Sequence, residues 1–214
     1  MWLPTRRLVG ALTAFGGVLA VVSAIPTQWY GPMPTDSYVF EPPRFSALWI
    51  ERTVVPGVTV LAALLLLTGL LALFRRDREW MARWHRWLAV VAVIGAATGT
   101  LATVLVAPTG GRGVGNPTTA MNVVLGALLA LLAVTLLFSG LVAWGTGYLR
   151  SGRRLLGGAL LGGPVGAVLI VAMSVATGVE FGSLGGLPVV VPLATMMVVL
   201  GYDLWMRSAN AHRT

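Results

Sequence analysis

The sequence contains no cysteine and no lysine, so all 15 of its basic residues are arginines. Without cysteine the chain has no disulfide, no thiol nucleophile and no thiolate ligand for zinc or an iron–sulfur cluster. Without lysine it cannot form a Schiff base with retinal, pyridoxal phosphate or a carbonyl substrate. These two absences exclude several large classes of enzyme and cofactor protein.

Histidine is also scarce, and the chain contains only His85 and His212. Both lie outside the long apolar runs, so they are not placed to hold a buried haem between them. His85 has no acidic or histidine neighbour at a spacing that would complete a metal site. We therefore expect no cofactor and no bound metal.

Charged residues make up only 10% of the chain, whereas hydrophobic residues make up 57% and the mean hydropathy is +0.84. A water-soluble domain needs far more surface charge than this. The net charge of +8 would be consistent with a nucleic-acid partner. We reject that interpretation because the arginines lie in short segments between apolar runs, as in membrane proteins.

Six apolar runs are long enough to cross a bilayer as helices, since about 20 residues span a hydrocarbon core of about 30 Å. The predicted spans are Leu8–Ile25, Val55–Phe74, Leu88–Ala107, Met121–Ala143, Leu155–Thr177 and Leu187–Met206. None of them has a charged residue in its middle third. The sequence therefore predicts an all-α fold, with residues 1–214 forming one domain and one bundle of six transmembrane helices.

Arginine is distributed unequally between the two sides of this predicted bundle, with twelve residues on one side and three on the other. Basic residues in short loops stay in the cytoplasm, so both termini are predicted to lie there. All eight tryptophans fall at or near predicted span ends, as an aromatic belt at the headgroups requires. The arginine-only, Ala/Gly/Val/Leu-rich composition is typical of a GC-rich prokaryotic genome, which predicts a location in a prokaryotic plasma membrane.

A cleaved signal peptide is the alternative for the first span. Arg6–Arg7, the following apolar run and the Val22–Ala24 ending fit such a peptide, and cleavage would leave five spans. We favour an uncleaved span because the apolar run is longer than most signal cores.

Small residues recur at four-residue spacing in the fifth predicted span. Gly158, Gly162 and Gly166 share one helix face, and Pro164 lies between them. Such a face lets a neighbouring backbone approach closely, and the proline removes one backbone hydrogen bond. The pattern predicts tight packing with a static kink, or alternatively a hinge beside a substrate cavity; we favour packing.

The predicted inner loop, residues 75–87, is the most charged part of the chain. Its tryptophans are spaced as on one face of a helix, with arginines in the same segment. The candidate headgroup-binding residues are Arg75, Arg76, Trp80, Arg83, Trp84 and Trp87. We predict a short helix in the membrane interface, with its rings toward the acyl chains and its guanidinium groups toward anionic headgroups. Topological anchoring explains this pattern more simply than specific lipid binding.

The predicted outer loop, residues 27–53, is rich in aromatic residues and proline. So much aromatic surface is unfavourable in water, so the loop is expected to fold over the outer mouth of the bundle. The candidate cap residues are Trp29, Tyr30, Tyr38, Phe40 and Trp49. Residues 46–53 are predicted to extend the second helix outward. A structural cap is favoured over a substrate lid.

The predicted interior offers little chemistry. The acids identified nearest the bilayer are Glu180 and Asp203, which both lie at span edges. The deeper polar groups are Thr13, Thr68, Thr98, Thr103, Asn122, Thr135, Ser139 and Ser174. Most of the hydroxyls are expected to bond to carbonyls of their own helix.

Three functions are consistent with this sequence. The favoured one is a non-enzymatic accessory, scaffold or partner-binding component, in contact with membrane lipids and with another membrane protein or a second copy. The second is a permease for a small neutral or lipophilic solute. The third is a lipid-active enzyme, for which Tyr202, Asp203 and His85 are the inner candidates.

Overall fold

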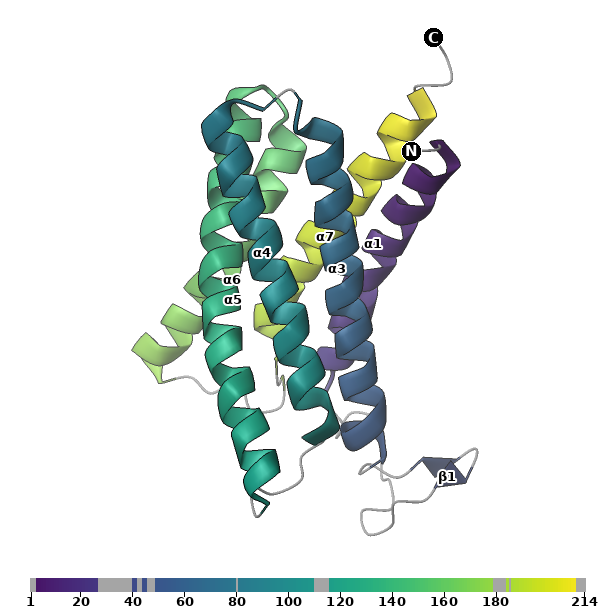
Figure 1. Cartoon of the computed structure of the whole chain (residues 1–214), viewed down its shortest axis with the longest axis vertical. Coiled ribbons are helices and arrows are strands. Elements are labelled where there is room, and N and C mark those ends of the chain that lie inside the picture. The colour runs from purple at the N-terminus through teal and green to yellow at the C-terminus, as the bar shows by residue number, and fades with distance from the viewer. Residues whose placement is uncertain are drawn as a thin grey trace.

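The computed structural model describes residues 3–26, 40–41, 44–45, 49–79, 81–109, 116–178, 184 and 186–210. Within them the chain forms six long helices (Figure 1). They are α1 (Leu3–Ala24), α3 (Val55–Asp77), α4 (Arg83–Val106), α5 (Pro117–Arg150), α6 (Arg154–Thr177) and α7 (Leu187–Asn210). Each is long and apolar enough to cross a membrane, which confirms the six predicted helices.

Several helices run past the predicted span ends. α5 is 34 residues long and continues from the predicted end at Ala143 to Arg150. α4 begins at Arg83 rather than at Leu88. A hydropathy pattern ends at the first charged or aromatic cluster, whereas a helix ends only where its backbone groups find other partners.

The outer segment contains short elements in its described part. Strand β1 (Phe40–Glu41) pairs antiparallel with β2 (Arg44–Phe45), so that Phe40 lies opposite Phe45. A π-helical turn, Ile50–Val54, leads directly into α3. The predicted extension of this helix into the preceding loop is therefore confirmed from Trp49 onward, while residues 46–48 lie outside the described residues. The cap residues Trp29, Tyr30 and Tyr38 lie outside the described residues.

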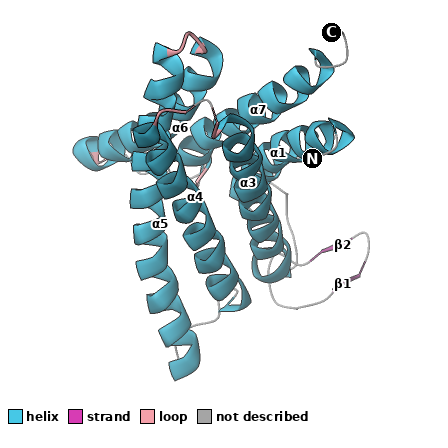
Figure 2. Ribbon diagram, turned by 45° about the horizontal axis from the view of Figure 1, so that its top comes forward, coloured by secondary structure: helices cyan, strands magenta, loops and turns pink. Residues whose placement is uncertain are grey.

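Consecutive long helices run in opposite directions, so α1 begins and α7 ends at the same end of the bundle (Figures 1 and 2). α3 and α5 also end there, and α4 and α6 begin there. We call this the basic end, because Arg76, Arg83, Arg150 and Arg154 lie at these helix termini. The other end is called the distal end.

The hydrophobic core lies in the half of the bundle nearest the basic end. Its largest fully buried side chains include Leu70, Leu73, Leu141, Trp144, Leu160 and Leu200. They come from the ends of α3, α5 and α7 and the start of α6. Trp144 is only 1% exposed, so the prediction that every tryptophan belongs to an interfacial belt is wrong for this residue.

Glycines allow several helix pairs to pack at backbone distance. A Cβ atom added at Gly140 in α5 would lie 2.5 Å from the amide nitrogen of Ala92 in α4. One at Gly10 in α1 would lie 2.7 Å from the carbonyl oxygen of Gly201 in α7. Such small-residue contacts are the usual basis of helix association in lipid.

In α6, the glycines that pack against neighbouring helices are not those that the sequence predicted. A Cβ atom at Gly158 or Gly162 would meet nothing within 4 Å, so the prediction that these residues pack within the chain is wrong. Gly157 and Gly163, each next to one of them, are buried against α5 and α7 respectively. Adjacent side chains point about 100° apart around a helix axis. The packed face of α6 therefore contains Gly157 and Gly163 and leaves Gly158 and Gly162 outside it.

The other two predicted residues in α6 do face the bundle. Gly166 approaches Pro192 of α7, with its added Cβ atom 3.2 Å from the proline Cβ. Pro164 is buried, and α6 continues through it as far as Thr177. α7 also contains a proline within its span, Pro192, and this residue contacts Gly163 and Gly166 of α6.

α5 and α6 diverge toward the distal end (Figures 1 and 2). Near their shared turn they contact each other, and a Cβ atom at Gly145 would lie 2.9 Å from the carbonyl oxygen of Gly157. Further along, α6 contacts α7 through Gly163, while α5 contacts α4 through Gly126. The distal halves of α5 and α6 therefore expose most of their apolar side chains.

Substituting two glycines tests this packing. Gly140→Ala is expected to lower the unfolding free energy by about 2 kcal/mol, because the new methyl group meets the α4 backbone. Gly158→Ala is the matched control, and it should leave stability unchanged or raise it by up to about 1 kcal/mol through higher helix propensity. Unfolding in detergent micelles would measure both, and equal effects would contradict the packing described here.

Candidate functional site

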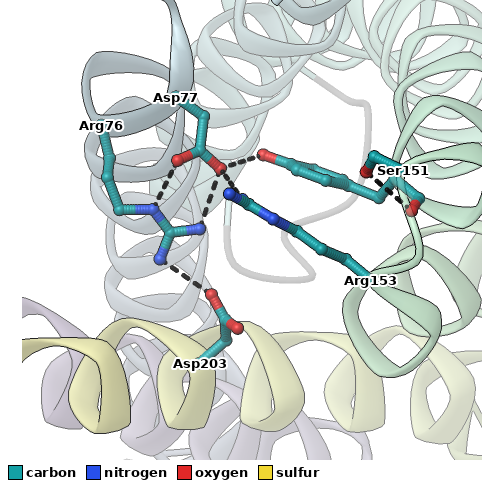
Figure 3. A network of polar contacts seen from close by, with 6 residues as sticks. Arg76, Asp77, Ser151, Arg153 and Asp203 are labelled. Carbon is teal, nitrogen blue, oxygen red and sulfur yellow. Dashed lines mark hydrogen bonds and ion pairs between the residues drawn. The ribbon is translucent and has the colours of Figure 1, made fainter. Parts of the chain in front are cut away.

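Asp77 lies at the centre of a polar cluster at the basic end (Figure 3). Its Oδ1 accepts a hydrogen bond from Arg76 Nε at 2.8 Å. Its Oδ2 accepts from Arg76 Nη2 at 2.9 Å, Tyr148 Oη at 2.6 Å and Arg153 Nη1 at 2.8 Å. Four hydrogen bonds therefore hold this carboxylate, three on Oδ2 and one on Oδ1.

The turn between α5 and α6 places Arg153 beside Asp77. Gly152 adopts a left-handed conformation, with φ of 80°. The Arg153 amide donates to the carbonyl of Tyr148 at 2.9 Å, and the Gly152 amide donates to that of Leu149 at 3.1 Å. This Schellman motif reverses the chain within a few residues. It brings the Arg153 guanidinium over the Tyr148 ring, 5.4 Å from its centroid.

Arg76 extends the cluster to α7. Its Nη1 donates to Asp203 Oδ2 at 2.8 Å, so one guanidinium joins two carboxylates. We call Arg76, Asp77, Tyr148, Arg153 and Asp203 the Asp77 cluster. It contains two cations and two anions, and it connects α3, α5, the α5–α6 turn and α7.

The charged groups at the centre of the cluster are largely shielded from solvent. The side chains of Asp77 and Arg76 are only 7% and 13% exposed. Pairing within such a site offsets the cost of removing charges from water. All four hydrogen bonds to Asp77 come from side chains of this chain, so the cluster links its helices to one another.

Two pockets lie at opposite ends of the described bundle. The basic-end pocket has a volume of about 330 Å³. Its lining residues are Met81, Ala82 and His85, around the start of α4, and Trp144, Gly147, Tyr148, Arg150 and Ser151, at the end of α5. The distal pocket, of about 260 Å³, lies between the start of α3 and the end of α4, and Glu51 and Thr103 are among the residues that line it.

The predicted interfacial helix over residues 75–87 is wrong. α3 continues through Arg75 and Arg76 to Asp77, and α4 begins at Arg83 after a turn. The segment therefore belongs to two transmembrane-length helices instead of a separate one.

The candidate headgroup residues consequently separate into different environments. Arg76 is buried in the Asp77 cluster, whereas Arg75, Arg83, Trp84 and Trp87 are exposed on helix ends. Trp80 lies outside the described residues.

The three residues that are candidates for a lipid-active enzyme lie in different environments and do not form one group. Asp203 is bonded to Arg76, while the His85 ring packs against Gly147, where an added Cβ atom would lie 2.6 Å from His85 Cδ2. Tyr202 is 54% exposed on α7. Among the described residues there is also no group of three or more acidic or histidine side chains that could hold a metal ion.

Most of the hydroxyl groups bond to their own helices, as the sequence predicted. Such bonds are made by Thr13, Thr68, Thr98, Thr103, Thr135 and Ser139. Several of these residues are exposed at the bundle surface, whereas Thr13 is buried. They do not converge on one site.

Asp77 and Tyr148 are members of the cluster that sequence reasoning missed. Asp77 lies in the charged segment 75–87, three residues after the apolar run that ends at Phe74. Tyr148 lies four residues after Trp144, beyond the predicted end of its span. An acid beside a span end, with arginines nearby, is the signal that could have identified the cluster.

No family model, curated protein or solved structure matches this chain.

Removing the central carboxylate tests the role of the cluster. Asp77→Asn should lower the unfolding free energy by about 3 kcal/mol, because Arg76 and Arg153 lose their shared anion. Tyr148→Phe deletes a single bond to that anion and should cost about 1.5 kcal/mol. Denaturation in detergent micelles, with the double variant to close a thermodynamic cycle, would measure both. Additive effects, or an unchanged Asp77→Asn protein, would contradict a coupled network.

Proposed function

We propose that this chain is a non-enzymatic, multi-pass component of a prokaryotic plasma membrane that binds another membrane protein or a second copy of itself. In this proposal both termini lie in the cytoplasm. The outward face of α6 is the surface that contacts the partner.

The proposed orientation rests on the basic end. The arginines at the starts and ends of the helices gather at this end, which is also where α1 begins and α7 ends. Basic residues in short connections are retained on the cytoplasmic side of a membrane. The exposed Trp84 and Trp87, at the start of α4, are of the type found at headgroup level.

The open surface around Gly158 and Gly162 is the observation that carries the partner-binding proposal. Both glycines are exposed, on the side of α6 opposite its contacts with α5 and α7. Leu169 continues the same face about two turns beyond Gly162 and is 58% exposed. A small-residue face next to large apolar side chains favours close approach by a second membrane helix.

The alternative, a permease for a small neutral solute, has less support. Its expected feature is a water-lined cavity with hydroxyl groups along its wall. The hydroxyls described above bond to their own helices, and those of Thr68, Thr135 and Ser139 lie on exposed residues. The two pockets described lie near opposite ends of the bundle.

Single-cysteine labelling tests the orientation, because the natural chain contains no cysteine. In intact cells, a membrane-impermeant maleimide should label Leu184→Cys at the distal end. Glu79→Cys at the basic end should react only after the cells are permeabilised. Both positions are exposed, so a difference in labelling would report the side of the membrane. Labelling of Glu79→Cys in intact cells would overturn the orientation.

Photo-crosslinking tests the partner surface. A photoreactive residue at position 169 should give a discrete heavier species in intact membranes, because that side chain lies on the Gly162 face. Gly162→Leu should reduce its yield at least about fivefold by blocking close approach. Gly57→Leu is the matched control, since Gly57 is also exposed and a Cβ there meets nothing within 4 Å.

The mass of the adduct distinguishes a second copy from a different protein. Failure to form any protein adduct would contradict the proposal. So would a crosslinking yield that falls equally in the Gly162→Leu and Gly57→Leu variants. A photoreactive residue at Phe15, which is 52% exposed on α1, shows how much crosslinking arises from random encounters.

A further inference from the structure

The basic-end pocket has a wall rich in hydrogen-bond donors. Arg150, at the end of α5, and His85, in the first turn of α4, both line it. No carboxylate contributes to the wall, because Asp77 is shielded behind Tyr148 and engaged by its own partners. A pocket with a cationic donor and no anion favours an anionic ligand.

The donors that face this pocket are not used by the fold. Among the described residues, Arg150 has no ion-pair partner, and His85 makes no hydrogen bond. Ser151 directs its hydroxyl to the Tyr148 carbonyl at 2.9 Å, which leaves its oxygen as an acceptor. Arg150 and His85 therefore stay available to a ligand.

Trp144 and Tyr148 also line the pocket. Their rings are stacked, with centroids 6.1 Å apart, and the Tyr148 hydroxyl donates to Asp77. The charge of the wall therefore comes from Arg150.

We propose that the basic-end pocket binds a phosphate-bearing anion between α4 and α5. Arg150 supplies the charge, and His85 supplies a second donor from the facing helix. The volume of about 330 Å³ is sufficient for a phosphate ester with a small polar substituent. The same chemistry is offered by the headgroup of an anionic lipid and by a soluble phosphate ester.

The position of the pocket favours a lipid headgroup as the source. It lies where α5 ends and α4 begins, and the exposed Trp84 and Trp87 on the first turns of α4 are suited to the headgroup region. If the orientation proposed above holds, this level corresponds to the cytoplasmic leaflet, where anionic lipids attract basic residues. Binding in detergent does not depend on that orientation.

Ligand-dependent stability of the purified full chain in a neutral detergent tests the site. A short-chain phosphatidylglycerol should raise the unfolding midpoint in a saturable manner, because a ligand that binds only the folded state stabilises it. Short-chain phosphatidylcholine is the neutral-headgroup control, and glycerol 3-phosphate is the soluble probe. Arg150→Gln should raise the half-saturating concentration of phosphatidylglycerol about fivefold, through loss of one charge contact.

Arg154→Gln is the matched control variant, because Arg154 is also exposed at the basic end but does not line the pocket. A lipid headgroup is supported if phosphatidylglycerol is the only one of the three probes that stabilises the protein, and if Arg150→Gln weakens this effect while Arg154→Gln does not. Stabilisation by glycerol 3-phosphate with the same sensitivity supports a soluble phosphate ester. The proposal is overturned if neither probe stabilises the protein, if phosphatidylcholine is equally effective, or if the two arginine variants behave alike.

Discussion

An ionised carboxylate within an apolar helix bundle must receive hydrogen bonds before the surrounding helices can pack against it. In this chain Asp77 imposes that requirement, and Arg76, Tyr148 and Arg153 meet it. Because the donors come from α3, α5 and the turn before α6, their geometry fixes these helices relative to one another. The link from Arg76 to Asp203 adds α7 to the same arrangement.

The bundle has two halves that differ in how firmly its helices are held. Near the basic end, the Asp77 cluster lies beside the hydrophobic core and the close contact between Gly145 and Gly157. Toward the distal end, α5 and α6 separate and expose their apolar side chains to the surroundings (Figure 2). The proposed partner surface lies on α6, and the proposed anion pocket lies in the firmly packed half. A rigid wall is expected to favour selective ligand recognition there.

The helices could be predicted from the sequence because each contains a long uncharged run, and lipid leaves the backbone no alternative to helical hydrogen bonding. The candidate site could not, because its members lie far apart in the chain and at or beyond the ends of the apolar runs. Asp203 was recognised as an acid near the bilayer, but nothing local indicates that Arg76 is its partner. Gly158 was predicted to pack and Gly157 does so instead, because a repeat of four residues does not indicate which side of a helix meets its neighbour.

The separation of 127 positions between Arg76 and Asp203 also constrains biosynthesis. A chain emerges from the ribosome starting at its N-terminus, so α3 is made long before α7. Arg76 can pair at once with the adjacent Asp77, but its second carboxylate arrives only with the final helix. In a chain truncated before α7, Nη1 of Arg76 would lack the carboxylate that it binds in the complete bundle. The last bond of the cluster therefore waits for the last helix.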